Sequence, residues 1–169
     1  MLPLWNRNGS FGNKDFVHVA GTDEAGRGPL AGPLVTAAVS SVPHEIDLPG
    51  LNDSKKVPPK RREALYDEIL QQALAVTVRI LGPQEIDTLN IYQAAKQSMQ
   101  MCLTHLSAAP DAALTDAMPL SLVGIPVKDL VHGDARSAAI AAASIIAKVT
   151  RDRIMVELDQ TYPDMLFFE

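Results

Sequence analysis

Residues 21–28, with the sequence GTDEAGRG, constrain the fold of this chain more than any other stretch. Two adjacent acids, Asp23 and Glu24, end an apolar run and are followed by the glycine-flanked Arg27. Carboxylates at a strand end can hold a divalent cation, and glycines beside them let a polymer backbone approach closely. The segment therefore indicates a buried strand ending in a polar site, and favours metal-dependent phosphodiester chemistry. A solvated turn without function is the alternative for this segment alone.

The two acids set a geometric condition on the strand that carries them. Successive side chains of a strand face opposite ways, so Asp23 and Glu24 cannot both reach one site from a regular strand. We expect Asp23 to be the last strand residue and Glu24 to begin the turn, where Ala25 and Gly26 permit an irregular exit.

The remaining apolar periodicity predicts alternating strands and helices. Expected strands cover residues 17–23, 34–42, 74–81, 112–116 and, less distinctly, 126–132. Expected helices cover residues 59–72, 91–107 and 135–160, and the last is apolar almost all round between residues 138 and 147, so it should be buried. These elements predict an α/β fold with a mixed sheet and an antiparallel meander at its start. Residues 1–16 are expected to form an N-terminal arm, and residues 17–169 one domain.

Composition sets the broad class of the protein. The 169 residues are 47% hydrophobic, and no apolar run reaches the roughly 18 residues that a membrane span needs. The N-terminus lacks the apolar core of a signal peptide. The single cysteine, Cys102, agrees with a reducing cytoplasm and falls on an apolar helix stripe, which predicts a core role. We expect a cytoplasmic monomer without a membrane partner.

The charge of the chain decides little about its partner. A net charge of −5 argues against nucleic acid, since phosphate binding favours basic surfaces. However, residues 55–62 carry five basic side chains, and acids that hold Mg²⁺ would inflate the negative count.

Two further acids also stand at the boundaries of expected elements. Asp116 ends a short apolar segment, and Asp134 directly precedes the last helix. Taken alone, Asp116 suits a turn and Asp134 suits a helix N-cap. Together with Asp23 and Glu24 they indicate a shared site, because strand ends and helix starts converge on one edge of an α/β sheet. Such a cluster suits two Mg²⁺ ions about 3.5–4 Å apart, which can serve an in-line displacement at phosphorus.

Candidate phosphate ligands lie in two places. Ser144 and Lys148 are spaced i, i+4 and share one face of the last helix, although a buried serine beside a snorkelling lysine is the alternative. Lys55 and Lys56 lie in an expected loop, where they could grip a backbone or simply be solvated. A dinucleotide-binding reading of the glycines fails, because their spacing is G-x-G-x-x-x-G and no helix follows.

From about Val19 to Pro163 the chain resembles the ribonuclease HII family, the type 2 ribonucleases H. The resemblance is carried by GTDEAGRGPLAGPLV, LNDSKKV, IDTLNIYQA and GDARSAAIAAASIIAKVTRDRIM, in the family's order. It implies a ribonuclease H-like fold and endonucleolytic cleavage of RNA in RNA–DNA hybrids. It also implies a cut 5′ of a ribonucleotide embedded in duplex DNA, leaving 3′-hydroxyl and 5′-phosphate ends, as the first step of ribonucleotide excision.

The resemblance also assigns roles to residues. The metal-binding carboxylates, for Mg²⁺ or Mn²⁺, would be Asp23, Glu24, Asp116 and Asp134. Substrate would be bound by Gly26, Arg27 and Gly28 at the 2′-OH of the RNA–DNA junction, and by Ser144 and Lys148 near the backbone phosphates. Lys55 is added as a substrate-binding candidate from its place in the basic loop. The 2′-OH is the group that lets a protein distinguish RNA from DNA.

The chain departs from the family pattern in two places. Many members read Val-Asp-Gly around the third acid, where this chain has Thr115-Asp116-Ala117. The family also continues past the Tyr-Pro after the long helix into a tyrosine-bearing segment, whereas this sequence stops at Glu169. A chain that binds hybrid but cuts poorly is therefore an alternative, and another nuclease of the same fold, such as a junction resolvase, is a second.

Overall fold

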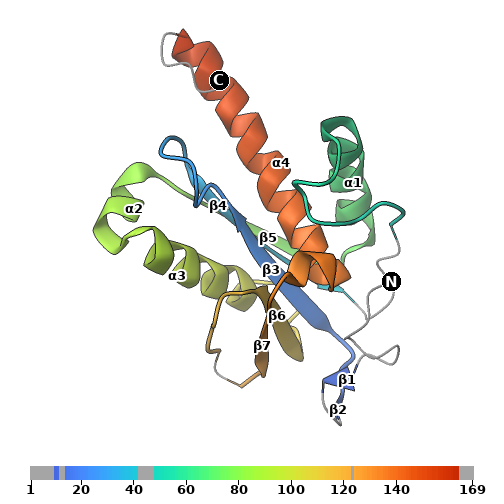
Figure 1. The fold of residues 1–169 in the computed structure, drawn as a ribbon. Helices are drawn as coiled ribbons and strands as arrows, with labels where there is room; N and C mark the ends of the chain where they lie inside the picture. Colours follow the sequence, from blue (N-terminus) through green and yellow to red (C-terminus); the bar gives the residue numbers. More distant parts are fainter. Residues whose placement is uncertain (1–9, 12–13, 42–47, 123, 164–169) are drawn as a thin grey trace.

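A single mixed sheet organises the computed structural model, which describes residues 10–11, 14–41, 48–122 and 124–163 (Figure 1). Its strand order is β5-β4-β3-β6-β7. The strands are β3 (Val19–Ala25), β4 (Leu34–Ser41), β5 (Ala75–Leu81), β6 (Ala112–Asp116) and β7 (Val127–Leu130). β3, β4 and β5 form an antiparallel meander, and β6 and β7 run parallel to β3. The predicted mixed five-stranded sheet is confirmed.

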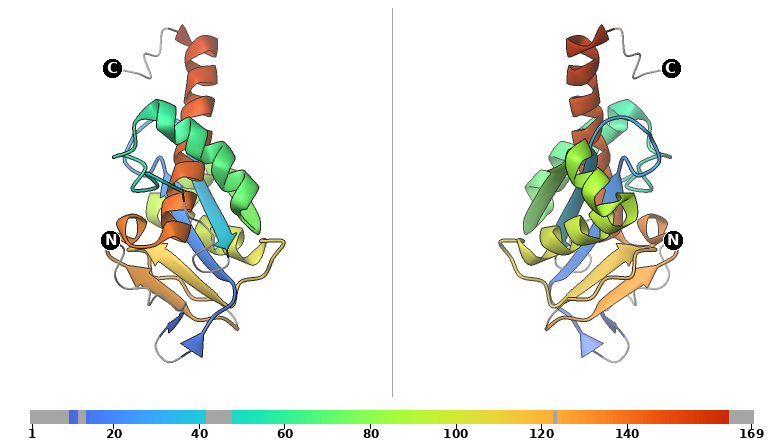
Figure 2. Two further views of the ribbon diagram at one scale, coloured as in Figure 1. Left: turned by 90° about the vertical axis from the view of Figure 1, so that its right-hand side faces the viewer. Right: turned by 90° about the vertical axis from the view of Figure 1, so that its left-hand side faces the viewer.

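Helices cover both faces of this sheet (Figures 1 and 2). The helices are α1 (Pro59–Gln72), α2 (Pro83–Leu89), α3 (Ile91–Thr104), the 3₁₀ turn η1 (Gly133–Ala135) and α4 (Ala138–Thr161). α1 and α4 pack with β4 side chains into one core cluster, while α3 packs with side chains of the opposite face into another. In the part of the chain described here, no helix is both long and apolar enough to cross a membrane.

Several predicted boundaries shift in the structure. α1 has the predicted bounds, but α2 was not expected, α3 ends before residue 107, and α4 begins after residue 135. α4 starts later because Ser137 is its N-cap, accepting a hydrogen bond from the Ile140 amide. Asp134 therefore does not cap this helix. Of the expected arm, 1–9 and 12–13 lie outside the described residues, and the strands β1 (Ser10–Phe11) and β2 (Lys14–Asp15) pair with each other.

The expectation that β3 ends at Asp23 is wrong. β3 continues to Ala25 because β4 pairs with it along its whole length, with Asp23 opposite Ala37 and Glu24 opposite Thr36. The glycine-rich sequence after Asp23 indicated that the strand would end there, but pairing with β4 keeps the β3 backbone extended for two more residues. Both acids are therefore strand residues.

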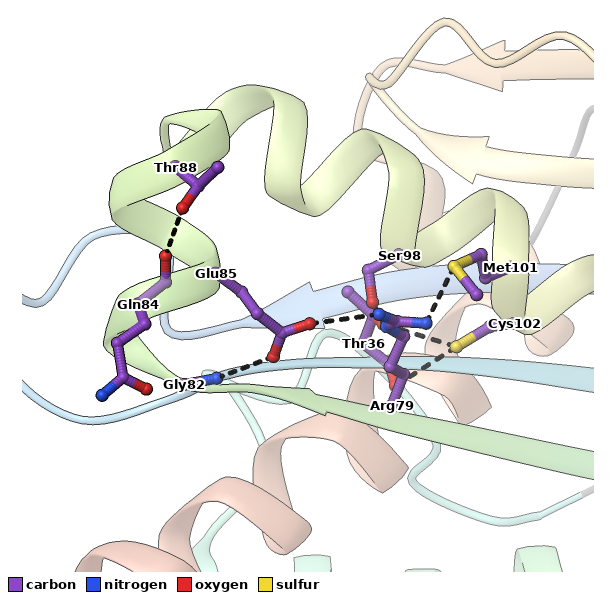
Figure 3. A network of polar contacts seen from close by, with 9 residues as sticks. All are labelled: Thr36, Arg79, Gly82, Gln84, Glu85, Thr88, Ser98, Met101 and Cys102. Carbon is purple, nitrogen blue, oxygen red and sulfur yellow. Dashed lines mark hydrogen bonds and ion pairs between the residues drawn. The ribbon is translucent and has the colours of Figure 1, made fainter.

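Cys102 is a residue of α3 and lies in the core, as the sequence predicts. It is buried, and its Sγ lies 3.4 Å from the hydroxyl of Thr36, which is also 2.6 Å from the hydroxyl of Ser98 (Figure 3). Burial raises the pKa of the Cys102 thiol. Arg79 covers this group from β5, bonded to Glu85 and to the Met101 sulfur. The Cys102 thiol therefore packs in the core on the face of the sheet opposite α4.

α4 rests directly on β3 at Gly21. A Cβ at Gly21 would overlap the carbonyl carbon of Ala139 and the backbone nitrogen of Ile140, so only glycine fits between strand and helix. The first half of α4 presents buried small residues to the sheet, chiefly alanines. Close approach at this point places the middle of α4 over the end of β3.

We expect Gly21→Ala to destabilise the protein by about 3 kcal/mol, because its methyl group can be accommodated only by moving backbone. Urea unfolding followed by circular dichroism measures this. The control is Gly28→Ala, whose added Cβ meets no atom within 4 Å and should cost about 0.5 kcal/mol or less. Equal stability of the two variants would contradict the proposed role of this contact.

Candidate active site

A cavity of about 510 Å³ opens at the ends of β3 and β6. The ten residues proposed as metal or substrate ligands line it: Asp23, Glu24, Gly26, Arg27, Gly28, Lys55, Asp116, Asp134, Ser144 and Lys148. Lys56, the other candidate phosphate ligand, does not line it, and its ammonium pairs with Asp53 at 3.5 Å. The ten come from the β3 end, the following loop, the loop before α1, the β6 end, η1 and α4. The fold therefore gathers the predicted residues into one place, although gathering alone does not assign their roles.

Asp23 and Asp116 are brought together by parallel pairing. β3 and β6 are in register up to Thr22 opposite Thr115, so the next residue of each strand is an aspartate at the same level. The Asp23 carboxylate accepts a hydrogen bond from the Glu24 amide at 2.8 Å. The Asp116 carboxylate accepts one from the Gly133 amide, also at 2.8 Å. Two carboxylates from neighbouring strands thus stand at the floor of the cavity.

Glu24 reaches the same cavity although it follows Asp23 in a regular strand. The pairing between β3 and β6 stops at Thr22, so the edge of β3 beyond it is no longer covered by a neighbouring strand. The longer glutamate side chain can turn around this open edge. Its Oε1 pairs with Arg27 at 3.0 Å, while its Oε2 is buried and has no hydrogen-bond partner among the described residues.

Asp134 is positioned by the turn η1. The amide of Gly133 is bonded to Asp116, so the turn that carries Asp134 is anchored on another acid of the cavity. A Cβ at Gly133 would meet Ile140 of α4 and the Thr115 carbonyl, so this turn packs closely against the sheet and the helix. Burial raises the pKa of Asp134, and the negative charges of Asp116 and Asp53 raise it further.

Asp53 is a fifth carboxylate of the cavity that sequence reasoning missed. It lies in the loop before α1, accepts a hydrogen bond from the Lys55 amide at 2.9 Å, and lies near enough to Asp134 to raise the pKa of that residue. Asp53 follows no strand and no helix, so neither periodicity nor element boundaries mark it. Its presence in the family-like stretch LNDSKKV was the only available signal.

The electrostatics of the cavity favour a bound cation. Burial raises the pKa of Asp23 well above its usual range, and the charge of Glu24 raises it further. Burial also raises the pKa of Glu24, which Arg27 partly offsets. Hard divalent cations prefer several carboxylate oxygens, and the buried, unpartnered Oε2 of Glu24 is such an oxygen. The donor set therefore fits Mg²⁺ or Mn²⁺.

The carboxylates of the cavity are not arranged as a complete set of metal ligands. Over the described ranges, no group of three or more acids, histidines or cysteines is arranged to hold a metal ion. Some of the oxygens are already engaged, because Arg27 binds Glu24 and the Gly133 amide binds Asp116. A cation would thus require the carboxylates to close together, whereas the Oε2 of Glu24 is not engaged by Arg27.

The α4 side of the cavity carries hydroxyl and cationic groups. Ser144 is buried and donates a hydrogen bond to the hydroxyl of Ser54 at 2.9 Å, and its proximity lowers the pKa of Asp23, against the larger effect of burial. Lys148, one turn further along, lines the cavity with its ammonium bonded to Asp152. Ser144 is therefore both a buried serine and a cavity residue.

Arg151 fixes the loop that carries Gly26, and sequence reasoning missed it too. The buried guanidinium donates to the carbonyls of Ala31 at 2.8 Å and Pro33 at 3.0 Å. Gly26 has φ of 104°, and a Cβ there would overlap the Pro33 carbonyl and the Arg151 side chain. Only glycine fits at this position. Helical spacing puts Arg151 seven residues after Ser144, which is the one sequence signal that could have found it.

The comparisons with known proteins agree with the family resemblance seen in the sequence. The sequence model of the ribonuclease HII family matches residues 20–168. Ribonuclease HII of Bacillus cytotoxicus is 56% identical over 150 residues, covering 89% of this chain and 57% of that protein. Ribonuclease HII of a Bacillus cereus strain is 54% identical, covering 91% of this chain and 59% of that protein. The chain thus spans less than two thirds of the length of these curated relatives.

A solved structure agrees in fold. The crystal structure of ribonuclease H2 from Pyrococcus horikoshii superposes with a TM-score of 0.76 at 30% identity, covering 86% of this chain and 77% of that one. The likeness extends to the arrangement of the sheet and its flanking helices, and identifies the fold as ribonuclease H-like.

We expect Asp23→Asn to stabilise the protein in metal-free solution at neutral pH. Because the pKa of Asp23 is raised in the folded state, the folded protein binds this proton more tightly than the unfolded chain does. Stability should therefore fall as pH rises from the ordinary aspartate pKa through the raised value, and asparagine removes this penalty. Thermal melting in chelator from pH 4 to pH 8 measures both effects. A variant that melts below wild type at neutral pH would contradict them.

Proposed function

This chain belongs to the ribonuclease HII family, and on that premise we propose that it is a metal-dependent endoribonuclease. Its substrates would be RNA–DNA hybrids and DNA duplexes with an embedded ribonucleotide, cut on the 5′ side of the ribonucleotide to leave 3′-hydroxyl and 5′-phosphate ends. One observation carries the proposal: the acids and the glycine-flanked arginine, from distant parts of the chain, line one cavity.

The carboxylates supply the proposed metal chemistry. Asp23, Glu24, Asp116 and Asp134 would hold two Mg²⁺ or Mn²⁺ ions, and Asp53 lies beside Asp134 where it can balance charge. When bound, the ions would activate water and stabilise the departing 3′ oxygen. Before that, the same acids repel a phosphate, so substrate and metal are expected to bind together.

The opposite wall would recognise the substrate. Gly26, Arg27 and Gly28 would contact the sugar: Gly28 leaves the backbone open, while Gly26 lets the loop pack on Arg151. Arg27 pairs with Glu24 at 3.0 Å and would stand between the proposed metal and sugar sites. Contact with the 2′-OH would select a ribonucleotide. Lys55, Ser144 and Lys148 border the cavity and would bind backbone phosphates of the cleaved strand.

Binding of hybrid with slow turnover is a second candidate function. The matched region covers 57% of the Bacillus cytotoxicus relative, so the activity of that whole protein is a proposal for this chain that needs its own test.

We expect the protein with Mg²⁺ or Mn²⁺ to nick a labelled duplex with one embedded ribonucleotide and to leave the all-DNA duplex intact. Chelator should stop the cleavage, and Asp23→Asn should lower kcat by about 10²-fold or more, since metal charge stabilisation supplies several kcal/mol. Gel analysis of the 5′-labelled strand measures both. Undiminished nicking by Asp23→Asn, or no nicking by wild type at any protein concentration, would refute the proposed activity.

A binding titration separates the two candidate functions. Hybrid affinity is measured alongside single-turnover rates at saturating protein. Tight binding with a rate far below that of a full-length Bacillus relative favours the binding function, while comparable rates favour the nuclease.

A further inference from the structure

Two ion pairs connect the cavity to helix α1. The Lys148 ammonium donates to Oδ1 of Asp152 at 2.6 Å, and Oδ2 of the same carboxylate accepts from Nη1 of Arg62 at 3.2 Å. Lys148 lines the cavity, whereas Asp152 and Arg62 do not. One carboxylate on α4 therefore ties a cavity cation to a cation on α1.

The ion pair between Lys148 and Asp152 adds little to the stability of α4 itself. Lysine precedes the acid at i, i+4, which is the weaker order for helix stability. Both side chains are about one third exposed, and pairs of this kind add little to stability. The main effect of this ion pair is therefore to fix the position of the Lys148 ammonium. Side chains of a helix lean toward its N-terminus, so Asp152 leans toward Lys148.

Arg62 restrains the side chain of Asp152. The Arg62 side chain is only 11% exposed, and its Nε has no hydrogen-bond partner within the described part of the chain. Its bond to Asp152 is thus the main compensation of a largely buried charge, and neither partner can leave without cost. The carboxylate is held from α1, and it holds Lys148 in turn.

We propose that Asp152, clamped by Arg62, is a positioning residue that fixes the Lys148 ammonium for a substrate phosphate. The inference rests on the proposed function, since it takes the phosphate of a hybrid as the group that Lys148 meets. An ammonium has three N–H donors, so the bond to Asp152 leaves two for the phosphate. A lysine already fixed in place loses less side-chain freedom on binding than a free one.

The two possible effects of Asp152 on binding have opposite signs. If its charge acts only at long range, removing it makes the surface more positive and tightens the binding of a polyanion. If it positions Lys148, removing it weakens binding because the ammonium must be ordered anew. We expect Asp152→Ala to weaken hybrid binding by about 3- to 10-fold.

The experiment measures anisotropy of a fluorescein-labelled RNA–DNA hybrid with Ca²⁺ in place of Mg²⁺, a hard cation with similar ligand preferences. The matched control is Glu63→Ala. Glu63 also joins α1 to α4, through Arg153 at 2.6 Å, but does not touch Lys148. The control removes the same charge and should leave affinity unchanged or slightly tighter. Asp152→Glu, which keeps the charge, should restore part of the lost affinity.

A double-mutant cycle with Lys148→Met completes the test. In that background, Asp152→Ala should have no further effect on affinity, because the ammonium that it positions is absent. Binding by Asp152→Ala as tight as wild type, or a loss that persists without Lys148, overturns the inference. Melting curves verify folding, and Asp152→Asn replaces Asp152→Ala if the alanine variant unfolds, with the same expected direction. If wild type binds no hybrid at all, the proposed function fails and this inference fails with it.

Discussion

The contact between Gly21 and the first turn of α4 is the constraint on which the cavity depends. Without a Cβ between them, strand and helix meet backbone to backbone, and the small residues that follow on α4 keep the helix close to the sheet. β3 carries Asp23 and Glu24 at its end, and α4 carries Ser144 and Lys148 above them. One close contact thus sets the distance between the anionic floor and the cationic wall.

This arrangement has an electrostatic cost that the rest of the fold offsets. Asp23 is buried between the sheet and α4, and both burial and the neighbouring Glu24 disfavour its ionised form. Functional sites commonly keep such unfavourable groups, because the surrounding packing holds them in place. Here that packing is the core cluster of β4, α1 and α4, which includes the fully buried Leu65, Ile145 and Ile146. A cation would relieve the repulsion, so metal binding and stability are expected to be linked.

The sequence predicted those parts of the fold and the site that follow from local patterns. Strand ends mark Asp23 and Asp116, and parallel strands bring such ends to one edge of a sheet, so the meeting of these acids was foreseeable. The end of β3 was not, because pairing with β4 extends the strand beyond its glycine-rich signal. Arg151 and Asp152 were missed for a similar reason. The carbonyls that Arg151 binds and the Arg62 that holds Asp152 lie about 90 to 120 positions away along the chain, where no periodic pattern connects them. Only the pair of Asp152 with Lys148 follows helical spacing.

The distribution of charge is compatible with the proposed polyanionic substrate. Five carboxylates line the cavity, those of Asp23, Glu24, Asp53, Asp116 and Asp134, and their formal charge equals the whole net charge of −5. Apart from them, acids and bases balance. Two divalent cations would offset four of these five charges, while Lys55 and Lys148 stand at the same cavity to meet phosphate. Because basic side chains line the same cavity as these five acids, the net charge of the chain does not by itself argue against a polyanionic partner.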